Sequence, residues 1–326
     1  MAVLVTGGAG YIGSHTVKHL KERGEEVVVV DNLQSGYREA VEVEDFYVVD
    51  IRNESDLSEV FSKHAVTGVI HFAASSLVGE SMEKPYEYYH NNVLGMLSLL
   101  KVMKDHDVDK IIFSSTAATY GEPVESPITE NSPTHPTNPY GETKLAMEKM
   151  MKWFDQAYGV RYVSLRYFNA AGAHYRGLIG EDHKPETHLI PLILQVPLGK
   201  RKQIFIYGDD YDTPDGTCIR DYIHVMDLAA AHGKALDYLR RGNPSEIFNL
   251  GSGKGYSVKE VIDRAREVTE HPIPAEVQSR RSGDPGILVA SSKKAEDILG
   301  WNPRYGDLKT ILEDAWRWHK NYPKGY

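Results

Sequence analysis

Tyr140 and Lys144 place a phenol and an ammonium four residues apart at the start of a helix-like run, residues 145–150. On a helix, side chains at positions i and i+4 share one face, with Cβ atoms about 5–6 Å apart. A tyrosine is a poor base at neutral pH because its unperturbed pKa is about 10. A lysine charge about 6 Å away, at an effective dielectric of about 20, favours the phenolate by roughly 2.8 kcal/mol, or about two pKa units. We therefore expect Tyr140 to approach the range of a general base, and a second positive charge to bring it closer.

A glycine-rich stretch, Gly7-Gly8-Ala9-Gly10-Tyr11-Ile12-Gly13, lies between an apolar strand-like segment, 2–6, and a helix-like segment that runs to Arg23. A second apolar segment, 27–30, ends in Asp31. Strand, glycine-rich turn, helix, strand and acid form the context that a dinucleotide-binding turn requires, although the spacing here is Gly-x-x-Gly-x-x-Gly. The helix N-terminus receives a pyrophosphate, and the acid accepts hydrogen bonds from ribose hydroxyls while it repels a 2′-phosphate. The pattern predicts NAD rather than NADP.

The elements that must position these residues alternate along the first half of the chain. Further strand-like segments span residues 46–51, 68–74, 110–115 and 163–168. Helix-like segments begin at Asn53, which forms a plausible cap pair with Asp56, and span residues 85–106. We predict an α/β fold, a doubly wound parallel Rossmann sheet with a smaller, mostly C-terminal substrate-binding domain. Ligands of such sheets bind at the carboxyl ends of the strands, where Asp50, Phe72, Ala73 and Thr116 lie.

The regular alternation fades after residue 168, although a helix at 225–241 and a strand at 247–250 indicate one more unit of the main sheet. Further helices are expected at 257–270, 292–299 and 307–320. We therefore expect residues 1–168 and 219–250 to form the NAD-binding Rossmann domain. Residues 169–218 and 251–326 are expected to form the substrate-binding domain.

Composition excludes several other classes of protein. The 326 residues carry a net charge of −9, with no run of basic residues, so we expect no nucleic-acid partner. Cys218 is the only cysteine, which excludes an intrachain disulfide and zinc sites of the CxxC type. Met1 leads directly into the first strand-like segment, and no apolar run reaches membrane-spanning length, so we expect a cytoplasmic protein with no membrane partner.

Two groups of residues could bind a metal ion. His174, His183 and His188 lie in a segment rich in glycine and charge, but their spacing fits no common ligand motif. The run from Arg220 to Asp227 gathers acids and a histidine, and there a helix start with an aspartate near its positive end is the preferred interpretation. We predict no metal site.

Several stretches together resemble the extended short-chain dehydrogenase/reductase family, and more narrowly the UDP-glucose 4-epimerase family within it. They are the glycine-rich stretch with its flanks (residues 6–15), the Tyr140/Lys144 pair, Phe72-Ala73, Val78-Gly79-Glu80-Ser81, Arg166-Tyr167-Phe168-Asn169, Asp215-Gly216-Thr217 and Arg220-Asp221-Tyr222-Ile223-His224-Val225. The resemblance covers essentially the whole chain.

The resemblance implies roles for individual residues. Tyr140 matches the base, Lys144 its partner on the nicotinamide ribose, and Thr116 the hydroxyl that bonds the 4-oxygen of the sugar. The implied NAD contacts are Gly7, Gly10, Tyr11, Ile12, Gly13, Asp31, Asn32, Asp50, Ile51, Phe72, Ala73, Asn92, Tyr140, Lys144 and Phe168. The implied UDP-sugar contacts are Thr116, Asn169, His188, Leu189, Arg220, Arg281, Asp284 and Leu288. Arginines suit a pyrophosphate because they form forked, charge-assisted hydrogen bonds.

The implied activity is reversible 4-epimerisation of UDP-glucose and UDP-galactose, by transient oxidation at C4 with tightly bound NAD. The oxidised nicotinamide would supply the second positive charge beside Tyr140. A homodimer joined through helices near 85–105 and 140–158 is also implied.

Three other activities compete with this one. A 4-epimerase of UDP-glucuronate or of a UDP-pentose would differ only in a few pocket side chains. A nucleotide-sugar 4,6-dehydratase would need an Asp-Glu pair after Thr116, where this chain has Ala117 and Ala118. A non-catalytic NAD sensor would not need the intact Thr116, Tyr140 and Lys144.

Three positions separate this chain from the family pattern. Ser76 stands where the best-known bacterial pattern has a lysine near the cofactor, which bears on NAD retention, and His188 replaces an asparagine beside the nucleotide. Leu288 stands where the family has a tyrosine or a smaller residue beside the C2 substituent of the sugar. We therefore expect UDP-glucose and UDP-galactose as the main pair, with measurable activity on the N-acetylated pair.

Overall fold

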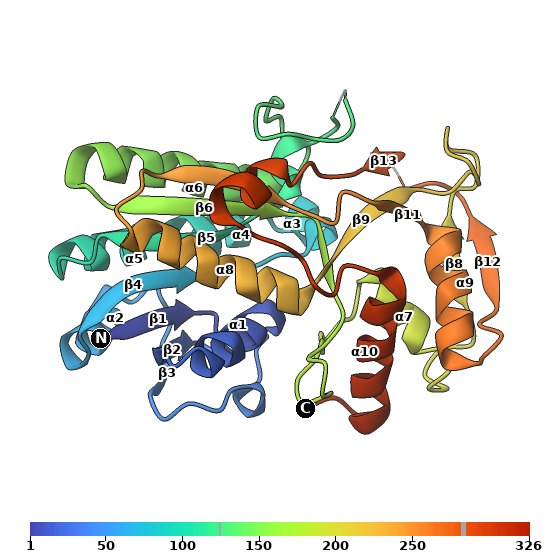
Figure 1. Cartoon of the computed structure of the whole chain (residues 1–326), viewed down its shortest axis with the longest axis horizontal. Helices are drawn as coiled ribbons and strands as arrows, with labels where there is room; N and C mark the ends of the chain where they lie inside the picture. The colour runs from blue at the N-terminus through green and yellow to red at the C-terminus, as the bar shows by residue number, and fades with distance from the viewer. Residues whose placement is uncertain (124, 282–284) are drawn as a thin grey trace.

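A seven-stranded parallel sheet forms the larger part of the protein in the computed structural model, which describes residues 1–123, 125–281 and 285–326 (Figure 1). Its strands lie in the order β10-β6-β5-β4-β1-β2-β3. Their bounds are β1 Ala2–Thr6, β2 Glu26–Asp31, β3 Phe46–Val48, β4 Val66–His71, β5 Lys110–Thr116, β6 Arg161–Tyr167 and β10 Glu246–Leu250. All six neighbouring pairs are parallel, which confirms the predicted α/β class.

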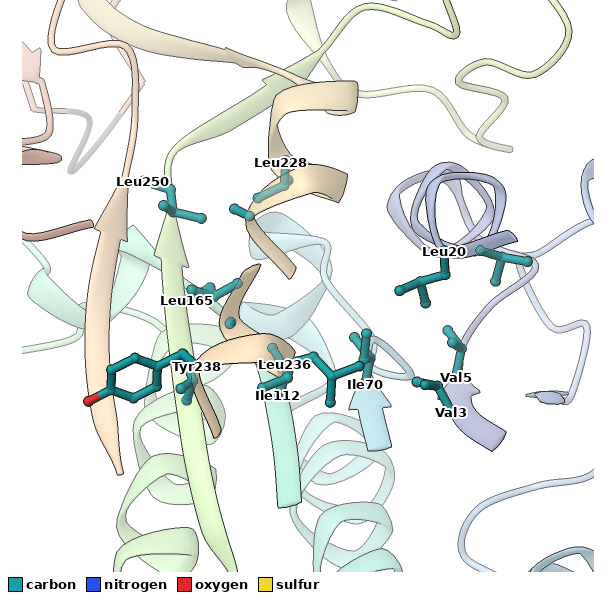
Figure 2. Close-up of a cluster of buried hydrophobic side chains, with 14 of the residues drawn as sticks. Val3, Val5, Leu20, Ile70, Ile112, Leu165, Leu228, Leu236, Tyr238 and Leu250 are labelled. Atoms are coloured by element: carbon teal, nitrogen blue, oxygen red, sulfur yellow. The ribbon is translucent and has the colours of Figure 1, made fainter. Parts of the chain in front are cut away.

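Helices cover both faces of this sheet because each central strand buries alternate side chains on opposite sides. Val3 and Val5 point into one apolar core, while Ala2 and Leu4 point into the other. The first core is closed by α1 (Tyr11–Glu22) and α8 (Val225–Arg240). Figure 2 shows Leu236 of α8 beside Ile70 and Ile112 of the sheet, and Leu20 of α1 near Val3 and Val5. The second core is closed by α2 (Glu54–Lys63), α5 (Leu94–Asp105) and α6 (Pro139–Tyr158).

A smaller lobe lies beyond the carboxyl ends of the main strands and has its own apolar core (Figure 1). Its strands are β7 Asn169–Ala171, β8 Ile204–Tyr207, β9 Ile219–His224, β11 Gly255–Ser257, β12 Ala275–Gln278 and β13 Ile287–Leu288. Strand β9 pairs with β7, β11 and β13, whereas β8 pairs with β12. Its helices are α7 Leu189–Leu194, α9 Val258–Thr269 and α10 Leu308–Asn321.

Most elements match the sequence prediction, with three local differences. The strand predicted at 46–51 ends at Val48. The single helix predicted over 85–106 is interrupted: α4 (Pro85–Tyr88) is followed by a wide π turn, η2 (Tyr89–Val93), before α5 begins. The segment predicted as a helix near 292–299 likewise contains a π turn, η4 (Ala295–Leu299). The predicted cap of α2 is confirmed, because Asn53 Oδ1 accepts a hydrogen bond from the Asp56 amide at 3.3 Å.

The side chain of Asn92 explains the π turn, since it is fully buried and must reach two partners off the helix axis. Its Oδ1 accepts a hydrogen bond from the Ser75 amide at 2.8 Å, and its Nδ2 donates to the Ser75 carbonyl at 3.1 Å and to Thr143 Oγ1 at 3.0 Å. These bonds tie the chain after β4 to the first turns of α6. A π turn at such a position is common near functional sites.

Short helices complete the chain: η1 Arg38–Ala40, α3 Val78–Glu83 and η3 Ala117–Tyr120. Within the described residues, no helix has the length and apolar character that crossing a bilayer requires.

Candidate active site

Helix α6 presents Tyr140 and Lys144 at the carboxyl ends of β5 and β6. Its start is fixed by Asn138, whose Oδ1 accepts a hydrogen bond from the Gly141 amide at 2.9 Å, and by Pro139 in the first turn. Both side chains are buried, with exposed fractions of 8% for Tyr140 and 3% for Lys144. The i, i+4 spacing therefore brings the phenol and the amine together on the face that meets the sheet, as the sequence predicts.

The amine and the threonine hydroxyl both lie at the end of β5. Lys144 Nζ lies 5.9 Å from the centre of the Tyr140 ring and donates a hydrogen bond to the Ser114 carbonyl at 2.8 Å. Thr116 is the last residue of β5, and its Oγ1 accepts a hydrogen bond from the Ala118 amide at 3.1 Å. The structure thus gathers the three predicted catalytic residues at one end of the sheet, and their roles stay predictions.

Burial governs the pKa values of this pair. Removal from water raises the pKa of Tyr140 to about 12, although the Thr116 hydroxyl counteracts this. Removal from water lowers the pKa of Lys144 to about 7, although the Glu148 carboxylate counteracts this. The expectation that Lys144 alone lowers the pKa of Tyr140 is therefore wrong for the chain without cofactor, because it left out the loss of solvation of both groups.

Glu148 extends the catalytic face of α6 by one more turn, and sequence reasoning missed it. Its carboxylate forms an ion pair with Arg166 of β6: Glu148 Oε1 lies 3.0 Å from Arg166 Nε, and Glu148 Oε2 lies 2.5 Å from Arg166 Nη2. Both side chains are only 4% exposed. Ser115 Oγ donates a third hydrogen bond to it at 2.6 Å. The signal was available, since Tyr140, Lys144 and Glu148 continue one i, i+4 series.

The glycine-rich turn has the shape that a pyrophosphate needs. Gly7 has a φ of +71°, and a Cβ there would lie 2.5 Å from the Ala73 amide nitrogen, while a Cβ on Gly13 would lie 2.1 Å from the Gly7 carbonyl oxygen. Helix α1 begins after Gly10 with no side-chain cap among the described residues and no acid in its first turn. Its amide groups and the positive end of its dipole are thus available to an anion, and the residues fit NAD.

Two carboxylates flank this turn at the ends of neighbouring strands. Asp31 is buried, and its carboxylate accepts hydrogen bonds from the Ala9 amide at 2.9 Å and the Leu33 amide at 2.8 Å. Burial raises its pKa, and these amides counteract the rise. The Asp50 carboxylate forms an ion pair with Arg52 and accepts a hydrogen bond from Asn32 Nδ2 at 3.4 Å. The hydrogen bond from Arg52 lowers the pKa of Asp50 to about 2. Both are suitable acceptors for ribose hydroxyls.

The other predicted cofactor contacts line the same end of the sheet. Phe72 follows β4 and packs on His232 of α8 at 4.6 Å between ring centres, and Phe168 follows β6. The side chain of Ile51 is buried in the second core. The Asn92 side chain is committed to Ser75 and Thr143, which is a structural use that the sequence did not reveal.

The predicted substrate residues lie on the smaller lobe and at its junction with the sheet. Leu288 of β13 pairs in register with Arg220 of β9, so these two predicted substrate residues lie on neighbouring strands. Asn169 Nδ2 donates a hydrogen bond to the Asp221 carbonyl at 2.9 Å, and Arg281 stacks over Tyr207 at 4.0 Å. His188 precedes α7, which begins at Leu189. Asp284 lies outside the described residues.

The acids in the run 220–227 serve the backbone. The Asp221 carboxylate accepts hydrogen bonds from the amides of Ser252 at 2.7 Å and Ala290 at 3.1 Å. The Asp227 carboxylate accepts hydrogen bonds from the amides of Arg304 at 2.7 Å and Tyr305 at 2.8 Å. Asp221 thus joins two distant loops to β9 of the smaller lobe, and Asp227 joins the loop before α10 to α8 of the main sheet, roles that depend on contacts far apart in sequence.

Comparison with known proteins is consistent with this geometry. The model of the NAD dependent epimerase/dehydratase family matches residues 3–251. The UDP-glucose 4-epimerase of Halalkalibacterium halodurans is 63% identical over 100% of this chain and 98% of its own length. A crystal structure of UDP-glucose 4-epimerase from Bifidobacterium longum in complex with NAD+ and UDP is 43% identical, with a TM-score of 0.95 and 100% of each chain covered. One from Brucella ovis in complex with NAD is 48% identical, with a TM-score of 0.95 and 97% of each chain covered.

Proposed function

This chain belongs to the NAD-dependent epimerase/dehydratase family, and we propose that it is a UDP-glucose 4-epimerase that interconverts UDP-glucose and UDP-galactose. One observation carries the proposal: Thr116, Tyr140 and Lys144 converge, buried, at the end of the sheet that also holds the glycine-rich turn. The full-length identity to UDP-glucose 4-epimerases supports the same activity.

We propose that Tyr140 moves the proton of the sugar 4-hydroxyl. NAD, when bound, supplies the oxidant at C4 and later the reductant at the same carbon. Burial raises the pKa of Tyr140 to about 12 even with Lys144 beside it, so the phenol would retain its proton until a second positive charge is present. Lys144 is placed to bind the ribose of the cofactor and to stabilise the phenolate, and Thr116 to hold the 4-oxygen by a hydrogen bond.

We propose that the smaller lobe binds the UDP part of the substrate. Arg220 and Arg281 would grip the pyrophosphate with forked hydrogen bonds, and Asn169 lies where β6 passes into this lobe. The division expected from the sequence, with 1–168 and 219–250 binding NAD and 169–218 and 251–326 binding the UDP-sugar, remains part of the proposal with one change. Strand β9 (Ile219–His224), which carries Arg220, pairs with strands of the smaller lobe and is assigned to the UDP-sugar side. The separate apolar core of the smaller lobe supports it.

The 4,6-dehydratase alternative lacks its acid and base. The two residues after Thr116 are Ala117 and Ala118, which open the short helix η3 and carry no ionisable group. Elimination of water needs both a proton donor and a proton acceptor beside the sugar. Nothing in this turn supplies them.

We propose a homodimer formed through α4, α5 and α6, in a cytoplasmic enzyme of galactose metabolism. Large apolar side chains are exposed on these helices and on η2: Tyr86 74%, Tyr89 45%, Leu94 38%, Leu97 45%, Trp153 66% and Tyr158 55%. Such a concentration is typical of a protein–protein interface. Light scattering of the purified protein should give twice the mass of one chain, and Leu97→Glu should give the single-chain mass.

Two measurements test the proposed function. Purified protein incubated separately with UDP-galactose, UDP-glucuronate and a UDP-pentose should convert UDP-galactose to UDP-glucose far faster than it epimerises the others, as read by chromatography. Denatured protein should release about one NAD per chain, without a phosphate on the ribose. Conversion of UDP-glucuronate alone, or release of NADP, would contradict the proposal.

A further inference from the structure

Four side chains of types that can ligate a metal ion converge on the segment between β7 and α7. They are Glu181, His183, Glu186 and His188, and one ligand atom from each lies within 4.8 Å of the others. This group is separate from the catalytic residues of α6 and β5. We propose that it is a binding site for one Zn²⁺ ion, or a chemically similar divalent transition metal, in each chain.

The spacing of the donor atoms matches a four-coordinate ion. Bonds of about 2.0–2.2 Å in a tetrahedron place neighbouring donor atoms about 3.3–3.6 Å apart. Glu181 Oε1 lies 2.5 Å from His188 Nδ1 and 3.3 Å from His183 Nδ1. Glu186 lies 3.6 Å from His183 Nδ1 through Oε2 and 3.9 Å from His188 Nδ1 through Oε1. The separations of 3.3 and 3.6 Å already match, whereas the 2.5 Å contact between Glu181 and His188 would have to open by about 0.8–1.1 Å.

The local contacts hold the four side chains in place, and an ion would displace the hydrogen bond between His188 Nδ1 and Glu181 Oε1. The Nδ1 atom of His183 is buried and forms no well-aligned hydrogen bond in the part of the chain that the structure describes, since its contacts with Glu181 Oε1 at 3.3 Å and Glu186 Oε2 at 3.6 Å are ion pairs only. Glu186 Oε1 accepts hydrogen bonds from the amides of Thr187 at 2.7 Å and His188 at 2.8 Å, which fixes the carboxylate and leaves Oε2 for an ion. Buried polar atoms without partners are rare, and an absent ion is one explanation for such an atom.

The charges also favour a divalent cation. Each carboxylate lies beside the Nδ1 atoms of both histidines, and an M²⁺ ion would displace the imidazole protons held there and neutralise the charge of −2 that remains on the group. Glu181 is only 4% exposed, and a buried carboxylate needs a charged partner; the two histidines fill that place now, and an ion would take it over. Nitrogen and oxygen donors in equal number favour Zn²⁺ over Mg²⁺ or Ca²⁺, which prefer oxygen ligands alone.

The position of the group suggests what the metal would do. The ring of Tyr11, at the start of α1, lies 6.2 Å from that of His183, and its hydroxyl donates to the Gly172 carbonyl at 2.8 Å. On the other side, Tyr326 N donates to Asp182 Oδ2 at 3.2 Å. An ion bound here would join the segment before α7 into one rigid loop between the glycine-rich turn and the C-terminus. Its role would be structural, since it lies outside the catalytic residues, and because His188 is also an implied UDP-sugar contact, the loop that it fixes would border the nucleotide.

Metal binding to the whole protein tests the site. Protein freed of metal with a chelator should bind one Zn²⁺ per chain by calorimetry, and saturating Zn²⁺ should raise Tm by about 5 °C or more. Co²⁺ should give the intense visible absorption of a tetrahedral ion. Mg²⁺ should do neither, and a Tm rise with Mg²⁺ equal to that with Zn²⁺ would overturn the assignment.

Variants separate a site from adventitious binding. His183→Gln and Glu186→Gln should each weaken Zn²⁺ binding by about tenfold or more and abolish the Zn²⁺-dependent rise in Tm. His174→Gln is the matched control, because His174 is a buried histidine of the same loop outside the group. It should lower Tm without changing the stoichiometry or affinity for Zn²⁺. Absence of stoichiometric binding, or equal affinity in the wild type and both ligand variants, would overturn the proposal.

Discussion

Replacing Glu148 by glutamine tests the buried support of the catalytic helix. The substitution leaves the Arg166 guanidinium, 4% exposed, without a counter-charge. Removing one partner of a buried ion pair costs about 3–5 kcal/mol. Because glutamine keeps one carbonyl oxygen as an acceptor for Arg166 or Ser115, we expect a loss of about 3 kcal/mol in the free energy of unfolding.

Urea denaturation at pH 7, with NAD present, measures this loss. The double variant Glu148→Leu/Arg166→Met should recover most of it, since apolar residues of similar size often replace a buried pair at little cost. Glu54→Gln is the matched control: its carboxylate lies 2.9 Å from Lys101 Nζ, but both side chains are about half exposed, and no measurable loss is expected. A small loss in Glu148→Gln, or a larger loss in the double variant than in the single one, would refute the reasoning.

The same substitution should change the pH dependence of turnover. The Glu148 carboxylate counteracts the effect of burial on the pKa of Lys144. Without it, Lys144 loses its proton at a lower pH, so the alkaline limb of the kcat profile should move to lower pH. A profile that coincides with that of the wild type would show that Glu148 acts on stability alone.

Three further substitutions have defined outcomes. Tyr140→Phe should lower kcat by about 10²–10⁴-fold or more in an epimerase assay while UDP and NAD binding by calorimetry stay nearly intact; weakened binding of both would point to a folding defect. Lys144→Met should move the pH–rate profile to higher pH. In NAD-depleted wild-type protein, the free energy of unfolding should rise by up to about 4 kcal/mol between pH 7 and 10. The reason is that burial lowers the pKa of Lys144 to about 7, so in this pH range the unfolded chain holds a proton that the folded chain has lost. Lys144→Met should remove this rise. Leu288→Tyr should cut kcat/KM for the N-acetylated substrate by about tenfold or more and for UDP-galactose far less; equal losses would mean that Leu288 only packs.

The order of strands and helices follows from local patterns, which is why the sequence predicts it well. Strand β1, helix α1 and the acid at the end of β2 lie within 31 residues, and their apolar periodicity and glycines determine them locally. The cap at Asn53 is also a local signal. The family resemblance then identifies the turn and the Tyr140/Lys144 pair.

The features that the sequence did not predict depend on contacts between distant segments. The π turn at Tyr89–Val93 exists because Asn92 reaches Thr143, 51 residues away. The pKa of Tyr140 depends on burial, which no i, i+4 argument contains. The spacing between histidines does not reveal the group that contains His183 and His188, because Glu181 and Glu186 complete it only when the loop is folded.

Retention of a label at C4 tests the central claim most directly. UDP-galactose carrying deuterium at C4 is converted in ordinary water, and the product is analysed by NMR. If oxidation and reduction occur at C4 within one closed site, the hydrogen that leaves this carbon returns to it, and UDP-glucose should keep nearly all of its deuterium at C4. Product with solvent hydrogen at C4, or no conversion by protein that holds NAD, would contradict the account.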